Sequence, residues 1–261
     1  MDEKKISWDN ITPKDKEDLK RDVYKFIDLK YLPSIFKDKK LAFLKVNKWD
    51  DPFENFIFKS NFKINGRKLE SDIFKVFANS TFGQSWTLHS ETDALWRIYS
   101  PNKNSVRIKT KASKLLQMIQ TKSDDSLYCM LGDVEYKTKN EFEKFISKLK
   151  THQDFRTDQF HTFNYFVKRT EFAHEKEFRV IYIADFENGK KNEILYFNID
   201  PNEFIIDILV DPRLTVSEFN IIKNTIRSLG YNGKIEQSSL YYWKPLNINL
   251  KTYNNWLQNR I

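Results

Sequence analysis

The stretch H-E-K-E-F-R, residues 174–179, places two glutamates one residue apart at the start of an apolar run. The run is rich in β-branched and aromatic residues, which is typical of a strand rather than a helix. Alternate side chains of a strand share a face, so we expect Glu175, Glu177 and Arg179 to point the same way. Two carboxylates about 6.6 Å apart along a strand repel each other unless a cation or a substrate compensates them. The pair therefore predicts either a substrate site or a structural ion pair with Arg179 or a lysine of another strand.

No other stretch of the sequence carries a familiar catalytic signature. Glycine-rich phosphate loops, the G-x-S-x-G elbow and the H-E-x-x-H zinc motif are all missing. Dispersed ligands such as His152, Asp158 and His161 are an alternative to ordinary surface or core histidines, but we predict no metal site. Cys129 is the only cysteine, lies among apolar neighbours, and is expected to be a small buried hydrophobic residue.

Composition bounds the class of protein. With 261 residues, 40% of them hydrophobic and 31% charged, the chain can bury a core without disulfides or a structural metal. The net charge of +8 favours a polyanionic partner such as nucleic acid, although lysines scattered among acids also fit biased composition. No run approaches the roughly 20 apolar residues of a membrane span, and the N-terminus lacks the apolar core of a signal peptide. We therefore predict a cytoplasmic protein with no membrane attachment.

The glutamate pair is expected to lie late in a single mixed α+β domain, residues 21–261, which follows a charged extension, residues 1–20. In that extension, Thr12 before Pro13 predicts the start of a helix. Strands are predicted at residues 23–29, 41–46, 82–88, 105–110, 134–137, 178–183, 194–200, 204–211 and 234–240. Helices are predicted at residues 30–40 (or a turn), 67–81, 90–99, 111–120, 141–150 and 216–229, with a loop at 49–56.

Two of these helices carry signals for where they begin or end. Ser90, with Asp93 three residues later, is a weak capping box for the helix at 90–99. Thr215 and Glu218 form a full T-x-x-E capping box, and Gly230 is expected to end the helix that they begin.

Several stretches, taken together, resemble a widespread bacterial family of unknown function. They are V-Y-K-F-I-D (23–28), W-D-D-P-F-E (49–54), L-W-R-I-Y (95–99), H-E-K-E-F-R-V-I (174–181) and the closing I-D-I-L-V-D-P with K-I-E-Q-S-S. Members of that family carry an L-Y-K-Y-R-like strand, an N-D-P-F-[DE] loop, W-S-H-Y and W-x-x-E-x-E-[WFY]-R in the same order. The chain departs from this pattern at Ile27, Asp50 and Ile98, where the family usually has arginine, asparagine and histidine.

More remotely, the layout is similar to the ADP-ribosyltransferase superfamily. In that superfamily an opening strand carries a basic residue, a middle strand carries serine or threonine, and a late strand carries E-x-E. The resemblance implies a split antiparallel sheet flanked by helices. Carried over to this sequence, Lys25 takes the first position and Ser85 the second, with Glu175 and Glu177 as the E-x-E.

The resemblance also implies a chemistry, with NAD⁺ as substrate. Cleaving the bond between nicotinamide and ribose develops positive charge on the sugar, which a carboxylate can stabilise. Glu177 would be that catalytic carboxylate, and Glu175 would position or deprotonate the acceptor. The implied cofactor-binding residues are Lys25, Ser85, Trp96, Tyr99 and Arg179, with Trp96 or Tyr99 stacked on nicotinamide.

Two functions follow from these residues. The first is an NAD-dependent ADP-ribosyltransferase or NAD glycohydrolase, such as a toxin or phage-defence effector, with nucleic acid, protein or water as acceptor. The second is a catalytically inactive nucleic-acid- or protein-binding module of the same fold, which the residues at positions 25, 27 and 98 favour. A third reading, a magnesium nuclease that uses Asp51, Glu54 and Glu177, has no motif behind it.

Overall fold

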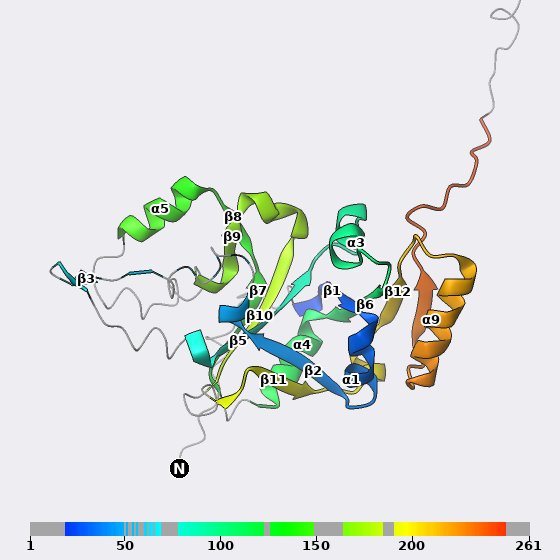
Figure 1. Cartoon of the computed structure of the whole chain (residues 1–261), viewed down its shortest axis with the longest axis horizontal. Coiled ribbons are helices and arrows are strands. Elements are labelled where there is room, and N and C mark those ends of the chain that lie inside the picture. The colour runs from blue at the N-terminus through cyan, green and yellow to red at the C-terminus, as the bar shows by residue number, and fades with distance from the viewer. Residues whose placement is uncertain are drawn as a thin grey trace, which may run out of the picture.

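A nine-stranded, mostly antiparallel sheet with helices packed around it forms the centre of the computed structural model (Figure 1). The α+β class expected from the sequence is therefore confirmed. The structure describes residues 19–49, 78–122, 126–148, 164–184 and 191–248, and scattered positions between 51 and 68. The predicted helix start at Thr12 and the dispersed histidines at 152 and 161 lie outside the described residues.

Eleven of the thirteen strands found in the described residues lie in two sheets that matter for the site. The large sheet contains β1 (Asp22–Asp28), β2 (Lys40–Lys45), β5 (Thr81–Thr87), β6 (Ser105–Lys111), β7 (Ser126–Asp133), β10 (Glu177–Ala184), β11 (Ile194–Asn198), β12 (Asp207–Val210) and β13 (Lys234–Gln237). A small parallel sheet pairs β8 (Glu135–Lys137) with β9 (Val167–Arg169), while β3 (Lys63–Ile64) and β4 (Arg67–Lys68) form a separate hairpin.

The helices and short 3₁₀ segments connect these strands. The α-helices are α1 (Leu32–Phe36), α3 (Asp93–Tyr99), α4 (Ala112–Gln120), α5 (Lys139–Lys148), α8 (Pro201–Phe204) and α9 (Val216–Ser228). The 3₁₀ segments are η3 (Leu29–Tyr31), η4 (Val46–Lys48) and η8 (Thr170–Glu175).

The large sheet divides at β5. One edge of β5 pairs along its whole length with β10, and β10 pairs in turn with β7. The other edge pairs with β2 near its start, where Leu44 faces Gly83, and with β1 at a single position, where Tyr24 faces Thr87. The strands β1 and β2 therefore diverge from a shared edge of β5, which confirms the split antiparallel arrangement.

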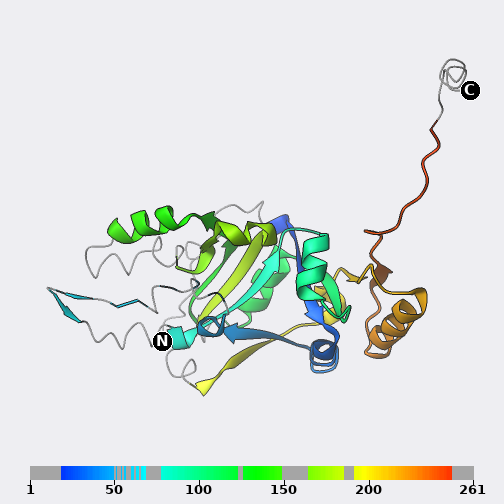
Figure 2. The ribbon, with the colours of Figure 1, turned by 45° about the horizontal axis from the view of Figure 1, so that its top comes forward.

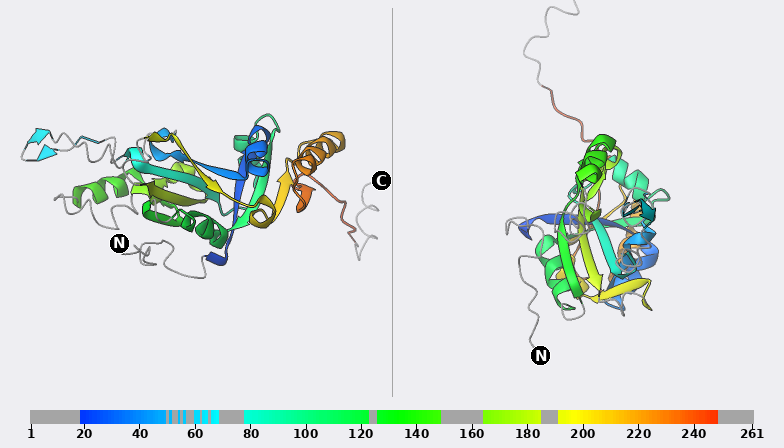
Figure 3. Two further views of the ribbon diagram at one scale, coloured as in Figure 1. Left: turned by 90° about the horizontal axis from the view of Figure 1, so that it is seen from below. Right: turned by 90° about the vertical axis from the view of Figure 1, so that its left-hand side faces the viewer.

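Apolar side chains from both halves of the split sheet form one main core. The helix α4 buries Leu115, Leu116 and Ile119 against it, and Figure 3 shows α4 lying along one side of the sheet. Figure 2 shows α9 beside β12 and β13 at the far end of the sheet from α5. This packing holds β1, β5 and β10 in fixed positions, so that side chains at their ends have defined neighbours.

The last β-α-β unit follows the sequence signals closely. Thr215 Oγ1 accepts a hydrogen bond from the backbone of Glu218, and the Glu218 carboxylate accepts one from the Thr215 N–H at 2.7 Å. The helix that they cap ends before Gly230, whose φ of 94° lies in the left-handed region that glycine tolerates. The predicted capping box and helix end are confirmed.

Several local predictions are wrong. The ends of the helix expected at 67–81 are wrong, because Arg67–Lys68 form β4 and Thr81 begins β5, and residues 69–77 lie outside the described residues. Thr92, not Ser90, caps α3, because its Oγ1 accepts a hydrogen bond from the Leu95 N–H at 3.1 Å. The strand expected from residue 204 begins at Asp207, because α8 precedes it.

Four strands were not expected: β3, β4, β7 and β9. Residues 126–133 form β7, which buries Cys129 as the apolar neighbours of that cysteine predict. No helix among the residues that the structure describes combines the length and the apolar character needed to cross a membrane.

Candidate functional site

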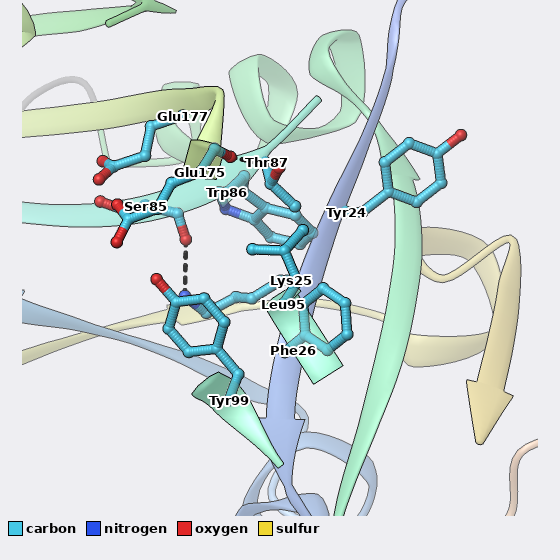
Figure 4. Close-up of a pocket in the computed structure, with 10 residues that line it drawn as sticks. All are labelled: Tyr24, Lys25, Phe26, Ser85, Trp86, Thr87, Leu95, Tyr99, Glu175 and Glu177. Carbon is cyan, nitrogen blue, oxygen red and sulfur yellow. Dashed lines mark hydrogen bonds between the residues drawn. The ribbon is translucent and has the colours of Figure 1, made fainter. Parts of the chain in front are cut away.

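A hollow opens where β1 diverges from β5, and we call it the carboxylate hollow. It has a volume of about 110 Å³ (Figure 4). The strands β1, β5 and β10, helix α3 and the end of η8 contribute to its wall. Its lining residues are Tyr24, Lys25, Phe26, Ser85, Trp86, Thr87, Leu95, Tyr99, Glu175 and Glu177. Five of the seven site residues expected from the sequence thus border one cavity.

Lys25 spans the split between the two strands. Its Nζ donates a hydrogen bond to the backbone carbonyl of Ser85 at 2.7 Å (Figure 4). In an unbroken sheet, that carbonyl would accept a hydrogen bond from the backbone of a neighbouring strand. Because the sheet is split here, the Lys25 side chain supplies the hydrogen bond instead. Burial lowers the pKa of Lys25 to about 8, although the charge of Glu177 acts in the opposite direction. The residue matched to the first position of the superfamily pattern is therefore structural as well as positively charged.

The two glutamates do not belong to one strand, contrary to the expectation from their spacing. Glu175 ends the 3₁₀ segment η8, and Lys176 follows with a φ of 42° in the left-handed region. Glu177 is the first residue of β10. Three hydrogen bonds fix this turn: from Thr87 Oγ1 to the Glu175 carbonyl at 2.6 Å, from the Leu88 N–H to the Lys176 carbonyl at 2.9 Å, and from the Glu177 N–H to Tyr136 Oη at 2.8 Å.

The turn brings both carboxylates to a single ammonium group. Lys168 Nζ, on β9, donates to Glu175 Oε2 and to Glu177 Oε1, each at 2.6 Å. Arg179 Nε donates to the other oxygen of Glu177 at 2.6 Å. Glu54 pairs with the same two cations, through Arg179 Nη2 and, at 3.5 Å, through Lys168 Nζ. Three carboxylates thus share two cations in a buried cluster.

This cluster drives the pKa values of the two glutamates apart. Burial raises the pKa of Glu175 to about 7, with a further increase from its hydrogen bond to Glu177, while Lys168 opposes the rise. Burial acts in the same direction on Glu177, but Arg179, the hydrogen bond from Glu175 and Lys168 outweigh it and lower the pKa of Glu177 far below its usual range. Glu177 therefore stays ionised at neutral pH, and Glu175 can gain or lose a proton there.

Tyr99 closes the hollow from α3. Its ring lies nearly parallel to that of Phe26, with centroids 5.9 Å apart, and its side chain remains partly exposed. Burial and the negative charges of Glu175 and Glu177 raise the pKa of its hydroxyl, which also hydrogen-bonds to Glu175. Tyr99 is therefore a neutral hydroxyl donor with an aromatic ring at the mouth of the site.

Trp96 does not line the hollow. Its side chain is 0% exposed, its ring packs edge-on against Phe26, and its Nε1–H donates to Glu91 at 2.9 Å. The expectation that Trp96 could stack on a ligand is corrected to a packing role, because no face of its ring reaches the cavity.

Arg179 also lies behind the wall rather than on it. It is 1% exposed, donates to the Tyr165 carbonyl at 2.8 Å, and has Trp49 4.6 Å from its guanidinium carbon. All of this places Arg179 in contact with Glu177 and not with the cavity. The predicted ion pair between Glu177 and Arg179 is confirmed, and Arg179 does not line the hollow.

Sequence reasoning missed Lys168 and Tyr136, which position the two glutamates. Neither residue stands in a motif. Tyr136, whose hydroxyl oxygen accepts a hydrogen bond from the Glu177 N–H, lies 41 residues before Glu177 in the sequence. The general expectation of a lysine partner from a neighbouring strand is confirmed, but no pattern singled out Lys168 among the many lysines. The small sheet of β8 and β9 brings both residues to the start of β10.

The acidic residues that a magnesium nuclease would use, Asp51, Glu54 and Glu177, form ion pairs with basic side chains. Glu54 and Glu177 converge on Arg179, and Asp51 accepts a hydrogen bond from Arg169 at 3.2 Å. Among the residues that the structure describes, no group of three or more histidine, cysteine, aspartate or glutamate side chains is arranged to hold a metal ion.

Comparison with known families agrees with the resemblance seen in the sequence. A family model described as a protein of unknown function, DUF2971, matches residues 95–180. The matched range begins in α3 and ends in β10, so it contains Tyr99, Glu175 and Glu177. The predicted resemblance to a family of unknown function is thus confirmed over this part of the chain. No protein with a curated description matches the chain significantly.

Among solved structures, the chain is similar to DarT from Thermus sp. 2.9. The complex of that protein with carba-NAD⁺ matches at 10% identity and a TM-score of 0.39, over 86% of this chain and 98% of DarT. The NAD⁺ complex matches at 9% identity and the complex with ADP-ribosylated single-stranded DNA at 10%, both with a TM-score of 0.39, over 86% of this chain and 98% and 97% of DarT. At this TM-score the likeness assigns no activity to the chain.

Proposed function

We propose that this chain is an NAD⁺-dependent ADP-ribosyltransferase or NAD⁺ glycohydrolase that works in the carboxylate hollow. The observation that carries the proposal is the meeting of Lys25, Ser85, Glu175 and Glu177 around one cavity, although up to 152 positions separate them in the sequence. The E-x-E resemblance had singled out the same four residues from the sequence alone. A flat, solvated sheet surface around Glu177 would have left the proposal without support.

The electrostatics of the two glutamates suit the breaking of a glycosidic bond. An anionic Glu177 at the wall of the hollow stabilises a ribose that becomes positively charged as nicotinamide leaves. Glu175, with a pKa of about 7, can accept a proton near neutral pH, where a general base works best. The site therefore offers Glu177 to stabilise the positive charge on the ribose and Glu175 to accept a proton.

The proposed reaction proceeds at the anomeric carbon of the nicotinamide ribose. The carbon–nitrogen bond breaks and its electron pair leaves with neutral nicotinamide. An acceptor hydroxyl or water then forms a bond to the same carbon and transfers its proton to Glu175. Lys25 would hold a diphosphate or ribose oxygen, and the ring of Tyr99 would lie against nicotinamide. Nucleic acid, protein and water are all compatible acceptors.

The size of the cavity limits which part of the substrate it can enclose. Pockets that bury a whole drug-sized ligand measure roughly 300–1,000 Å³. The carboxylate hollow, at about 110 Å³, is large enough only for the reacting end of NAD⁺. In this proposal the adenosine half lies outside the hollow.

The test is incubation with NAD⁺ labelled in its adenylate part, with free nicotinamide and transferred label measured together. We expect the wild type to release nicotinamide and Glu177→Gln to lose about 10²–10³-fold of that activity, as happens when one preorganised electrostatic group is removed. Circular dichroism and thermal unfolding check that the variant is folded. The control is Glu236→Gln, which removes an exposed carboxylate paired with Lys234 on β13.

The second candidate function is a catalytically inactive binding module of the same fold. It is favoured by the burial of Glu177, which is 5% exposed and already paired with two cations, as in a purely structural cluster. A folded wild type that neither consumes NAD⁺ nor transfers label to nucleic acid or cell extract would favour this module. Full activity in Glu177→Gln would reject the assignment of the catalytic carboxylate.

A further inference from the structure

A second and larger hollow, which we call the edge hollow, lies along β11. It has a volume of about 340 Å³ and is lined by Lys40, Lys122, Asn192, Ile194, Leu195, Tyr196 and Asn198. Within the described part of the chain, β11 is the last strand at its end of the sheet and pairs with β2 alone. None of these residues takes part in the carboxylate hollow.

Two lysines flank β11. Lys40 Nζ lies 5.7 Å from the centre of the Tyr196 ring, and Lys122 Nζ lies 5.6 Å from the centre of the Phe197 ring. Because neighbouring side chains of a strand point to opposite faces, the two ammonium groups approach β11 from its two sides. Their backbones are fixed: Lys40 pairs with Asn198 in the sheet, and the Lys122 carbonyl accepts a hydrogen bond from Tyr182 Oη at 2.7 Å.

Within the described part of the chain, no carboxylate pairs with these two lysines. The wall of the edge hollow contains no acidic residue, and neither Lys40 nor Lys122 forms an ion pair with any residue that the structure describes. The nearest acid along the strand, Glu193, already pairs with Lys45 at 3.0 Å and with Lys48 at 3.6 Å. The positive charge of this surface is therefore available to an anion from outside.

An exposed aromatic ring lines the same hollow as these cations. Tyr196 is 41% exposed, and its neighbour on the same face of the strand, Ile194, is exposed as well. Exposed aromatic rings beside lysines are the combination by which proteins bind single-stranded nucleic acids, with bases stacked on rings and phosphates at cations. An acidic protein segment would use the lysines but would gain little from the ring.

We propose that the edge hollow binds a single strand of nucleic acid, with phosphates at Lys40 and Lys122 and a base against Tyr196. Exposed lysines at positions 37, 39 and 191, with exposed Asp38 between the first two, adjoin the hollow in sequence. The site requires no NAD⁺ chemistry, so it stands whether or not the carboxylate hollow is catalytic. If that hollow does transfer ADP-ribose, the edge hollow is a place to hold a nucleic-acid acceptor.

The experiment measures binding of a fluorescein-labelled oligothymidylate of about 15 nucleotides, by anisotropy over a range of salt concentrations. We expect Lys40→Ala with Lys122→Ala to weaken binding at least about 10-fold and to lower the salt slope by about 0.7 for each lost phosphate contact. Tyr196→Ala should weaken binding by about 5-fold or more and leave the salt slope unchanged, because a stacked base carries no charge.

The matched control is Lys139→Ala with Lys144→Ala on α5, which removes the same net charge far from β11 (Figures 1 and 2). It should leave affinity within about 2-fold. Equal loss in both double variants would overturn the proposal, because binding would then follow net charge alone. Thymidine monophosphate that binds as tightly as the strand would overturn it in favour of a mononucleotide site, and equal competition by polyglutamate in favour of an acidic partner.

Nicotinamide release provides the independent readout. The Lys40, Lys122 and Tyr196 variants should hydrolyse NAD⁺ at the wild-type rate in the absence of nucleic acid. Glu177→Gln should bind the oligonucleotide with wild-type affinity. Failure of one function therefore leaves the result for the other intact.

Discussion

The two hollows of this molecule treat charge in opposite ways. In the carboxylate hollow, Glu175 and Glu177 are 8% and 5% exposed and share Lys168 at 2.6 Å. In the edge hollow, Lys40 and Lys122 face the surface with aromatic rings nearby and no acid in the wall. In the carboxylate hollow the charges are paired within the protein, whereas in the edge hollow the lysines are open to solvent or to a ligand.

The difference follows from the cost of desolvation. A buried ion loses several kcal/mol of hydration unless a partner compensates it, so charges inside the fold must come as a cluster. An exposed lysine keeps its water and needs no partner. A buried cluster can therefore fix pKa values for chemistry, whereas an open set of lysines can only attract an anion. The following predictions test this contrast, from the largest effect to the smallest.

Removing Arg179 should have the largest effect on stability. Arg179→Met leaves Glu54 and Glu177 buried without their main cation, and breaking such a pair costs about 3–5 kcal/mol of unfolding free energy. Urea unfolding followed by tryptophan fluorescence measures the loss. Arg97→Met, which breaks an exposed ion pair with Asp93, is the control and should change stability far less. Equal losses of unfolding free energy in the two variants would contradict the claim that buried charges depend on their partners more than exposed charges do.

Removing the proton acceptor should lower the rate at least as much as the loss of Glu177. Glu175→Gln is expected to lower transfer or hydrolysis by about 10²–10⁴-fold, the usual contribution of a positioned general base. The variant keeps a polar side chain of similar size next to Lys168. Single-turnover nicotinamide release measures the change, and an unaltered rate would assign the proton transfer to another group.

The pH profile should be bell-shaped, with its maximum between about 7 and 8. Glu175 must be deprotonated to act as a base, so activity rises as pH increases through its pKa of about 7. Lys25 must be protonated to hold an anion, so activity falls as pH increases through its pKa of about 8. The measurement is kcat/KM for NAD⁺ from pH 5 to 10. The rising and falling sides of this profile give the pKa values of the two groups in the protein without bound substrate.

Lys168 should determine the pH at which activity rises on the acid side of the profile, which we call the acid limb. Its hydrogen bond and charge lower the pKa of Glu175, so Lys168→Met should move that limb to higher pH. Lys168→Arg, which keeps the charge, should move it less. A purely structural role for Lys168 would lower the rate equally at every pH and leave the limb in place.

The smallest effect is expected at the open site. Lys40→Met should change the free energy of unfolding by less than about 0.5 kcal/mol, because an exposed lysine without an ion pair contributes little to stability. Urea unfolding beside Arg179→Met checks this. A loss of several kcal/mol would mean that the edge hollow is part of the structural core rather than a binding surface.

Local signals in the sequence predicted much of the fold. The capping box at Thr215, the glycine at 230 and the β-branched and aromatic run after Glu177 each lie within a few residues of the structure that they determine. Such signals work because a cap or a strand face depends on neighbours in the chain. They failed at Ser90, where Thr92 competes for the same cap, and at the two ends of the helix expected at 67–81, where residues 67–68 and 81 lie in strands.

The sequence by itself determined which residue types could do chemistry: the glutamate pair, the lysine of the first strand and the serine of the middle strand. Only the tertiary structure decided how they work together. The register of β5 against β1 and β10 made the hollow, and β9 brought in Lys168, which no motif marks. Glu54 meets Arg179 across 125 positions, and Trp96 turns inward while Tyr99, three residues later, faces the cavity. These outcomes depend on long-range packing, and long-range packing sets which charges are buried and therefore which pKa values shift.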